Sequence, residues 1–497
     1  MVLGAIAAAI VALHTLTNGR YGIHRDELQV LDDARHLDWG FVAYPPFTPF
    51  IERIALALFG GWLPGLRLSS AFAQGGVIFF SGLIARELGG KRLAQVVAAL
   101  CVAAAPLVVF ESTEFQYTSF ELLWCVLAVY FILRVINTEN PRSWLAVGAM
   151  LGLGLMTKYS VAFFIAGIAV GILLTPARRW LRSPWLWSGA ALALLIVLPN
   201  LIWQVRHHFI WLDFIRHIHV RDVSEGRADH FLRDQFLIPA NPFTAPIWIA
   251  GLVYLFFIRA AKPYRILAWM YVAPFAVYFF TKGRGYYTGS LYPMLLAAGA
   301  VWEVNWLASR GSTASGRPIW SRAVLVATFV AIAAGIALAV SFLVPILPPD
   351  SPHNLAIRAS DDLREEIGWQ ELVATVAGIR DSLSPSERAN FAILGTNYGE
   401  AGAIDFYGPA YGLPPAISGV NSIWQRGYGS PPPQTLIVIG LSRRFVDRNF
   451  QACRLAGHIT NRYNILNEET REHPDIFVCG PPIQPWPAFW SDFHYFG

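Results

Sequence analysis

Two adjacent carboxylates near the start of the chain, Asp26 and Glu27, are the strongest candidates for chemistry. Because neighbouring carboxylates repel each other, one of them is expected to have a raised pKa and to accept a proton near neutral pH. Arg25, beside the pair, could hold an anion or bind Glu27. The alternative is a solvated helix start, since Asp and Glu are favoured in the first turn of a helix.

A second group of carboxylates, Glu111 and Glu114, lies in the segment 106–116, which contains no basic residue. Carboxylates there could orient an acceptor, bind sugar hydroxyls or ligate a metal ion. Alternatively, they cap the entrance to the following helix. The sequence leaves both interpretations open.

Three cations, Lys158, Lys282 and Arg284, interrupt otherwise apolar segments. A lysine between two apolar stretches is costly and requires an anionic partner. The phosphate of a phosphate-linked sugar would supply one, because fixed positive charge stabilises a phosphate leaving group. For Lys282 and Arg284 the alternative is snorkelling to lipid headgroups.

The composition shows what must position these residues. The chain is 55% hydrophobic and only 14% charged, whereas soluble domains carry about a quarter charged residues. Its mean hydropathy is +0.44. Much of the surface must therefore face lipid, which predicts a polytopic α-helical membrane protein.

Apolar stretches long enough to cross roughly 30 Å of hydrocarbon recur along the chain. The first lacks a signal-peptide cleavage site and is interpreted as a membrane span. The pair 144–157 and 159–175 requires a very tight turn at Lys158. About 11 spans are predicted, at 2–17, 65–85, 93–110, 117–134, 144–157, 159–175, 185–203, 243–258, 265–281, 286–307 and 321–346.

Charge asymmetry orients these spans. With a cytoplasmic N-terminus, the inner loops hold most Lys and Arg residues of the short connections, as the positive-inside rule requires. These loops are 86–92, 134–142, 176–184, 259–265 and 308–322, the last including Arg317. The outer side then receives loops 18–64, 106–116 and 204–242 and the tail 347–497.

The tail, 347–497, reads as a separate soluble domain after a membrane domain, 1–346. Helical patterns at 361–383 and near 442–452 alternate with β-type runs, which predicts a small α/β domain. The expected strands are Phe391–Leu394, Thr435–Ile439 and Ile476–Cys479. An oxidising compartment would favour a disulfide between Cys453 and Cys479, and the alternative is two reduced cysteines in a small core.

Two amphipathic helices are expected in the loop 18–64. Such helices lie along an interface rather than crossing it, which would place Asp26 at the level of the lipid headgroups. An enzyme acting on a lipid-linked phosphate must work at that level. The stripes are Leu28, Leu31, Arg35 and Trp39, and Phe50, Ile54 and Leu58.

The loop 204–242 is rich in histidine, and we interpret it as a polar lid over a substrate cleft. No H-E-x-x-H or cysteine-based zinc spacing accompanies its histidines. The sequence predicts no defined metal site or cofactor but leaves a divalent metal open. The histidines are His207, His208, His217, His219 and His230.

Together these residues resemble a known family. Tyr21-Gly-x-His-Arg-Asp-Glu-Leu, Ala34-Arg-His-Leu-x-Trp-Gly40 and Pro45-Pro46 look like the first outer loop of bacterial glycosyltransferase family 39. That family is similar to dolichyl-phosphate-mannose–protein mannosyltransferases and to the aminoarabinose transferase that modifies lipid A. Further matches are Gly152-Leu-Gly-Leu-Met-Thr-Lys158, Pro199-Asn-Leu-Ile-Trp-Gln204, Gly285-Tyr-Tyr, Leu291-Tyr-Pro-Met-Leu295, Asn397-Tyr-Gly-Glu-Ala-Gly-Ala403 and Phe406-Tyr-Gly.

The resemblance implies a GT-C fold with juxtamembrane helices in the first periplasmic loop. It implies an inner-membrane enzyme that uses a polyprenyl-phosphate sugar donor and the hydroxyl of a lipid, glycan or protein acceptor. Membrane lipids are its other expected partners, and binding to nucleic acid is not expected. Where relatives often have tyrosines after Asp-Glu-Leu, this chain has Gln29-Val30, which could alter donor or acceptor contacts.

The resemblance also suggests roles for the candidate residues. Asp26 would act as general base in an inverting single displacement. Lys158, with Arg284 or Arg25, would offset the charge left on the phosphate. Substrate contacts are expected from Arg25, Glu27, Glu111, Glu114, Lys158, Lys282, Arg284, Tyr286 and Tyr287.

Two other classes of protein compete with this interpretation. A transporter or flippase of lipid-linked sugars would also need many spans and basic outer residues. Transporters usually show repeated halves and polar residues at the bilayer midplane, whereas the carboxylates here cluster at one face. A membrane-anchored module that binds cell-wall polymers would leave the first loop unexplained.

Overall fold

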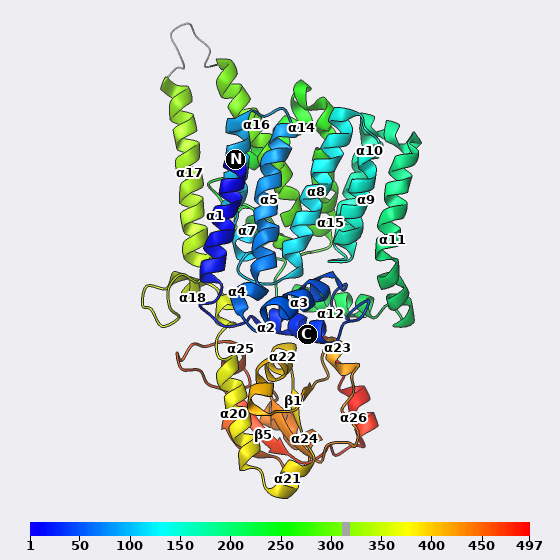
Figure 1. Ribbon diagram of the computed structural model, residues 1–497, viewed down its shortest axis with the longest axis vertical. Helices are drawn as coiled ribbons and strands as arrows, with labels where there is room; N and C mark the ends of the chain where they lie inside the picture. Colours follow the sequence, from blue (N-terminus) through cyan, green and yellow to red (C-terminus); the bar gives the residue numbers. More distant parts are fainter. Residues whose placement is uncertain (311–318) are drawn as a thin grey trace.

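The computed structural model describes residues 1–310 and 319–497, so Arg317 of the predicted loop 308–322 lies outside the described residues. In Figure 1 a bundle of roughly parallel helices lies above a smaller α/β domain. The helices of the bundle are α1 Val2–Thr17, α5 Leu68–Glu87, α6 Arg92–Ala103, α7 Pro106–Phe110, α8 Tyr117–Thr138, α9 Ser143–Leu155, α10 Val161–Leu174, α11 Pro184–Arg206, α14 Ala245–Phe257, α15 Arg265–Phe280, α16 Tyr292–Arg310 and α17 Ile319–Leu343.

Each predicted span contains a helix of this bundle, and the predicted pair 144–157 and 159–175 is two helices, α9 and α10. By length and composition, 4 of the described helices could cross a membrane, namely α5, α8, α11 and α17. The number rises to 6 if α10 with the 3₁₀ turn Pro176–Arg182, bent by 103°, and α14 with Arg259–Phe280, bent by 89°, each count as one broken span. The chain is therefore a multi-pass helical membrane protein.

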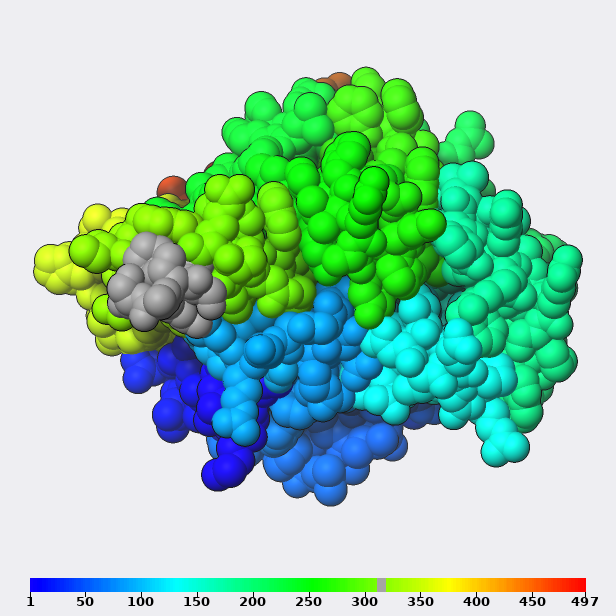
Figure 2. Space-filling view, turned by 90° about the horizontal axis from the view of Figure 1, so that it is seen from above, coloured from blue at the N-terminus to red at the C-terminus, as the bar shows by residue number. Residues whose placement is uncertain are grey.

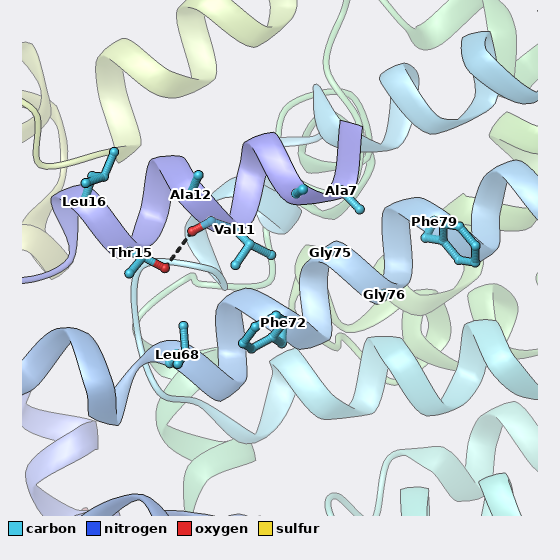
Figure 3. Close-up of a pocket in the computed structure, with 11 residues that line it drawn as sticks. Ala7, Val11, Ala12, Thr15, Leu16, Leu68, Phe72, Gly75, Gly76 and Phe79 are labelled. Atoms are coloured by element: carbon cyan, nitrogen blue, oxygen red, sulfur yellow. Dashed lines mark hydrogen bonds between the residues drawn. The ribbon is translucent and has the colours of Figure 1, made fainter. Parts of the chain in front are cut away.

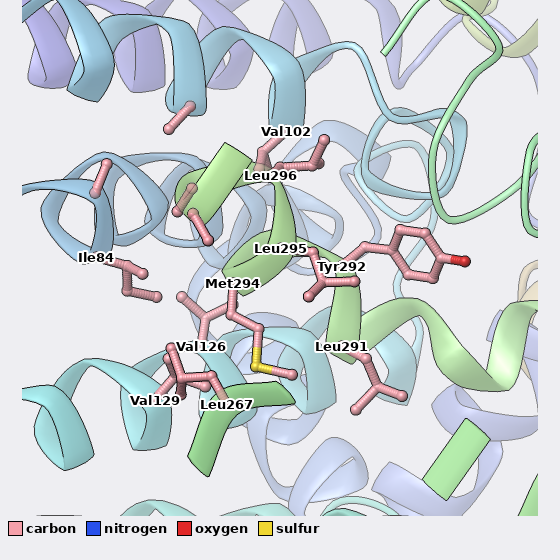
Figure 4. Packing of buried hydrophobic residues seen from close by; sticks show 14 of the residues in the cluster. Ile84, Val102, Val126, Val129, Leu267, Leu291, Tyr292, Met294, Leu295 and Leu296 are labelled. Atoms are coloured by element: carbon pink, nitrogen blue, oxygen red, sulfur yellow. The ribbon is translucent and has the colours of Figure 1, made fainter. Parts of the chain in front are cut away.

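The bundle packs through close backbone contacts around α16. A Cβ added to Gly299 would lie 1.8 Å from the carbonyl oxygen of Ile247, so α14 and α16 approach closely only because glycine is there. Figure 4 shows Met294 pointing toward Val126 and Leu267, and Leu296 toward Val102. Figure 2 views the bundle from the end opposite the α/β domain. In this view the blue residues near the α5–α6 connection lie against the green residues of later bundle segments.

Short helices cross the end of the bundle that faces the α/β domain (Figure 1). They are α2 Arg25–Arg35, α3 Phe47–Phe59 and α4 Leu63–Leu66. On α3, Ile54 is 56% exposed and Leu58 71% exposed, as expected for a stripe that faces lipid headgroups. The interpretation of α2 was wrong: Leu28 and Leu31 are buried in a core shared with Ile393 of the α/β domain. Its apolar stripe covers protein rather than membrane.

The α/β domain contains a five-stranded sheet in the order β2-β1-β3-β5-β4. β1 pairs in parallel with β2 and β3, whereas β5 pairs antiparallel with β3 and β4. In the central register, Ile393 lies opposite Ile437, and Ile437 lies opposite Val478. The strands are β1 Phe391–Gly395, β2 Ala416–Ile417, β3 Thr435–Ile439, β4 Arg454–His458 and β5 Asp475–Cys479.

Helices cover both faces of this sheet. The face with Ile393 packs against α20, α22 and α2, and the face with Leu394 packs against α26. The predicted helix 361–383 is instead two helices, because Gly368 interrupts it with a φ of 104°. The helices are α18 Leu355–Ala359, α19 Asp361–Arg364, α20 Trp369–Ser382, α21 Pro385–Ala389, α22 Tyr398–Tyr407, α23 Asn421–Trp424, α24 Arg443–Asn449, α25 Glu468–Arg471 and α26 Trp486–Asp492.

The structure joins Cys453 to Cys479 by a disulfide with an S–S distance of 2.07 Å. This bond ties the residue before β4 to the end of β5. Cys101 and Cys125 are free and buried in the bundle, where they behave as small apolar residues.

Candidate functional site

Asp26 lies in the first turn of α2, at the boundary between the bundle and the α/β domain. Tyr398 Oη donates a hydrogen bond to Asp26 Oδ1 at 2.8 Å. Gln116 Nε2 donates to Oδ2 at 3.1 Å. Burial alone would raise the pKa of Asp26, but His24, Arg25 and the two donors outweigh it and lower the pKa. The raised pKa expected for one member of the pair is therefore not found at Asp26, which is an ionised carboxylate.

Glu27 has a structural role, and its predicted contact with substrate does not fit. It is 2% exposed, and Arg67 donates to it from Nε at 2.8 Å and from Nη2 at 2.5 Å. The backbone N–H groups of His24 and Phe115 donate to it at 2.8 and 2.7 Å. With both oxygens occupied by protein donors, Glu27 fixes α2 instead of binding a ligand.

Arg25 points away from Glu27 and toward the α/β domain. Its guanidinium pairs with Glu468 and lies 5.1 Å from the centroid of the Tyr398 ring. Both alternatives from the sequence, a bound anion or a pair with Glu27, are thus replaced by a contact between domains. No local pattern could indicate it, because the partner lies hundreds of residues away.

Glu111 and Glu114 lie between α7 and α8, and both are buried. Burial, opposed by Lys158, raises the pKa of Glu111 to about 8. Burial and the charge of Glu27 raise the pKa of Glu114 well above its ordinary value. Glu114 lies 3.6 Å from His24 and faces the Glu27–Arg67 pair, so its predicted substrate contact is not supported.

Lys158, in the tight turn between α9 and α10, lies in a cage of tyrosines. Its Nζ is 5.0 Å from the ring centroid of Tyr117, 5.4 Å from that of Tyr286 and 5.5 Å from that of Tyr287. Rings at these distances attract a cation through their negative faces. The predicted cation and both predicted tyrosines therefore come together.

The anionic partner that Lys158 requires is Glu121. Its Oε2 lies 3.0 Å from Lys158 Nζ, and its Oε1 accepts a hydrogen bond from Ser160 at 2.7 Å. Sequence reasoning missed Glu121 because it stands inside the apolar stretch 117–134. The available signal was a lone carboxylate in a membrane span, which usually marks function or a buried pair.

Arg284 is held by α12, the helix Ile210–Ser224 of the histidine-rich loop. Its Nε and Nη2 donate to the two oxygens of Asp222 at 2.6 and 2.5 Å. Lys282 is exposed and makes no ion pair with a described residue. It lines a small cavity of about 310 Å³ with His230 and Arg233, apart from the Lys158 cage.

Tyr117 connects these groups, although the sequence did not single it out. It is the first residue of α8 and lies within electrostatic range of Asp26, Lys158 and Arg284. Asp26 comes from the first loop, Lys158 from the α9–α10 turn and Arg284 from the segment before α16. Residues from separate loops thus act electrostatically on one tyrosine at one end of the bundle.

The histidine-rich loop is mostly helical. His207 stacks on Trp203 at a centroid distance of 3.8 Å, and His217 contacts Phe496 near the C-terminus at 5.9 Å. Among the described residues, no three His, Cys, Asp or Glu side chains come together as metal ligands. The loop supplies Asp222, which binds Arg284.

A second ionisable cluster lies between α2 and the α/β domain. Arg426 pairs with Asp32 at 2.5 Å and with Asp33 at 3.2 Å. Asp405 on α22 accepts the N–H of Ala416 at 2.7 Å. Burial, assisted by the charge of Asp32, raises the pKa of Asp405 to about 7. This part of the domain contact is therefore sensitive to pH.

We predict that Asp405→Asn stabilises the protein at neutral and alkaline pH. The folded state keeps a proton on Asp405 that the unfolded chain releases near pH 4, so stability falls as pH rises from about 4 to about 7. The asparagine oxygen can still accept the Ala416 N–H and carries no charge. The unfolding temperature should exceed that of the unsubstituted protein by on the order of 5 °C at pH 8.

Thermal unfolding in detergent between pH 4 and pH 8 measures this effect. The difference should vanish toward pH 4. Asp447→Asn, which removes an exposed carboxylate of the same domain, is the matched control and should show no such trend. An Asp405→Asn curve parallel to the unsubstituted one would contradict the assignment of this proton.

One apolar groove lies away from the charged groups. A groove of about 690 Å³ runs between α1 and α5, and Figure 3 shows Val11, Leu68 and Phe72 along it with Gly75 and Gly76. None of the carboxylates or cations above lines it. The ionisable candidates therefore lie outside this groove.

The fold resembles that of solved structures over nearly the whole chain. The crystal structure of ArnT from Cupriavidus metallidurans bound to undecaprenyl phosphate aligns with a TM-score of 0.60 and 15% identity. The alignment covers 96% of this chain and 97% of that one. The arabinofuranosyltransferase AftD from mycobacteria aligns with a TM-score of 0.56 and 13% identity, over 97% of this chain and 40% of that one.

Sequence comparisons also match proteins that are named as sugar transferases. The profile described as dolichyl-phosphate-mannose-protein mannosyltransferase matches residues 43–203. An undecaprenyl phosphate-alpha-4-amino-4-deoxy-L-arabinose arabinosyl transferase of Pseudomonas fluorescens is 25% identical over 278 residues, 52% of this chain and 47% of that protein. The chain spans about half the length of the first curated relatives it matches. These matches confirm the resemblance to glycosyltransferase family 39 and relate the chain to the aminoarabinose transferases.

Proposed function

We propose that this protein is a membrane glycosyltransferase that moves a sugar from a polyprenyl-phosphate donor to an acceptor hydroxyl. The observation that supports it most is that Asp26 and Lys158 meet at neighbouring residues: Gln116 donates to Asp26 at 3.1 Å, and the Tyr117 ring lies 5.0 Å from Lys158 Nζ. Arg284 also acts electrostatically on Tyr117. A carboxylate that can accept a proton and cations that can bind a phosphate are what such a transfer needs. Related proteins are named for the use of undecaprenyl phosphate aminoarabinose and for galacturonosyl transfer to lipopolysaccharide.

Asp26 is the proposed general base. Its lowered pKa leaves it ionised at neutral pH. Asp26 takes the proton of the acceptor hydroxyl as that oxygen attacks the anomeric carbon. The bond between the anomeric carbon and the phosphate oxygen breaks at the same time, so the configuration inverts. The polyprenyl phosphate leaves with the electron pair of that bond.

The cations keep hydrogen-bond donors for the phosphate even though each already has an acidic partner. Lys158 Nζ lies 3.0 Å from Glu121 and 3.4 Å from Thr118 Oγ1, which leaves one of its three donors. Arg284 binds Asp222 through Nε and Nη2, so Nη1 remains for a ligand. Tyr286 and Tyr287 would contact the sugar or phosphate beside Lys158.

The site is assigned to the periplasmic face of the bacterial inner membrane. The basic loops 86–92, 134–142, 176–184 and 259–265 then face the cytoplasm. Residues 1–346 form the proposed catalytic membrane domain, and 347–497 form a periplasmic domain. The Cys453–Cys479 disulfide is consistent with an oxidising compartment.

A transfer assay tests the proposal. The purified full chain would be incubated with undecaprenyl-phosphate aminoarabinose or galacturonate and with lipopolysaccharide from cells that lack the gene. We expect sugar to leave the donor and a matching mass increase on an envelope lipid or glycan, absent from knockout cells. Movement of intact donor across vesicles without loss of its sugar would instead identify a transporter.

A further inference from the structure

The α/β domain reaches directly into the proposed site through one side chain. Tyr398 begins α22, and its hydroxyl donates to Asp26 Oδ1 across 372 residues of sequence. Burial and the charge of Asp26 raise the pKa of Tyr398 above its ordinary value. The phenol therefore stays protonated and can only donate to the carboxylate.

The start of α22 is held firmly. Asn397 caps the helix by accepting the N–H of Glu400 at 2.8 Å. Glu400 in turn accepts the N–H of Asn397 at 3.2 Å and that of Thr396 at 2.7 Å. Such a reciprocal capping box fixes the first turn of a helix, so the position of Tyr398 is set by the backbone of the α/β domain.

Two glycines bring α22 onto α2. A Cβ added to Gly402 would lie 2.7 Å from the carbonyl oxygen of Leu28, and one added to Gly399 would lie 2.9 Å from Arg25 Cβ. Any side chain at these positions would push the helices apart. The close approach brings the Tyr398 hydroxyl within reach of Asp26.

The ring of Tyr398 is also held from its face. Arg25 lies over it at 5.1 Å and pairs with Glu468 on α25. Asn397 contacts Glu469 on the same short helix at 3.3 Å. The phenol is thus clamped between the residue that precedes Asp26 and the α/β domain.

We infer that Tyr398 is a positioning residue for Asp26, so that the α/β domain completes the active site. Its hydrogen bond fixes the carboxylate rotamer and stabilises the ionised form, while Gln116 holds the other oxygen. Tyr398 keeps its own proton throughout, and the acceptor's proton goes to a remaining lone pair of Asp26. This role rests on the proposed function of Asp26 as base.

The test is Tyr398→Phe in the full chain. Loss of a hydrogen bond to a charged group should raise the pKa of Asp26 by about one unit. The acidic limb of the pH profile of kcat/KM should move up by the same amount, and kcat should fall about tenfold because the rotamer is no longer held. Tyr411→Phe, at an exposed site in the same domain, should leave the profile unchanged.

A measurement that does not need transfer separates this inference from the proposed function. Infrared difference spectra of the protein against its Asp26→Asn variant report the pH at which Asp26 protonates. That pH should rise in Tyr398→Phe and in Gly402→Ala, which keeps the phenol but forces α22 away from α2. An unchanged protonation pH in both variants would overturn the inference. A shifted pH in a protein without transferase activity would overturn only the proposed function.

Discussion

Replacing Asp26 by asparagine is expected to reduce sugar transfer by about 10²–10⁴-fold, the usual contribution of a general base. The variant should fold, because Asp26 is only partly buried and asparagine can still accept the Tyr398 hydroxyl. The measurement is transfer from the polyprenyl-phosphate donor at saturating donor and acceptor. Equal yields of monodisperse protein in detergent establish that folding is unaffected.

Two variants sharpen this experiment. Asp350→Asn removes an exposed carboxylate outside the site and should keep full activity. Glu111→Gln removes the only other candidate base among the predicted carboxylates near Lys158. Because the pKa of Glu111 is raised to about 8, it is mostly protonated at pH 7 and its loss should cost much less. Full activity in Asp26→Asn, or a larger loss in Glu111→Gln, would move the base from Asp26 to Glu111.

Replacing Arg67 by methionine is expected to be the most destabilising single change. The Arg67 side chain is fully buried. It pairs with Glu27 at 2.5 Å and with Glu366 at 3.2 Å, and it donates to the carbonyl of Asn18 at 2.9 Å. Removing one partner of a buried ion pair leaves an unpaired charge and costs about 3–5 kcal/mol. Thermal unfolding in detergent and the yield of folded protein measure this loss.

A compensating change tests the cause. Glu27→Gln in the Arg67→Met background removes the unpaired charge and should recover part of the unfolding temperature. Arg20→Met, at an exposed site near the end of α1, should behave like the unsubstituted protein. If Arg67→Met unfolds at the same temperature as Arg20→Met, the buried pair does not hold α2 to the bundle.

Sequence patterns located most of the helices and strands, but they did not show which surface each one packs against. Hydropathy located the helices of the bundle, and short apolar runs located β1, β3 and β5. β2 and β4 escaped notice because β2 has only two residues and β4 is largely exposed. The stripe of α2 placed Leu28 and Leu31 on one apolar edge, which was interpreted as facing the membrane interface. It could not say that much of the covering surface comes from residues such as Ile393 of the α/β domain.

The candidate site was subject to the same limit: its residues could be recognised from the sequence, but their partners could not. Asp26, Lys158 and Tyr286 were recognisable from residue type and motif, and the structure brings Lys158 and Tyr286 together. Contacts between distant segments were out of reach: Glu27 with Arg67, Arg25 with Glu468, and Asp26 with Tyr398. Residue type alone cannot distinguish a carboxylate that binds substrate from one that neutralises a buried arginine. Only the long-range pairing decides that difference.

The hydrogen bond between Asp26 and Tyr398 also has a consequence for the biogenesis of the protein. Its partners are 372 residues apart, so at about 5–20 residues per second a ribosome needs about 20–75 s to synthesise the second after the first. On the proposed topology, the last domain must also be translocated before α2 finds its cover. A nascent chain with all its membrane helices inserted would still lack the completed site, so catalysis would begin only after the C-terminal segment has been exported and folded.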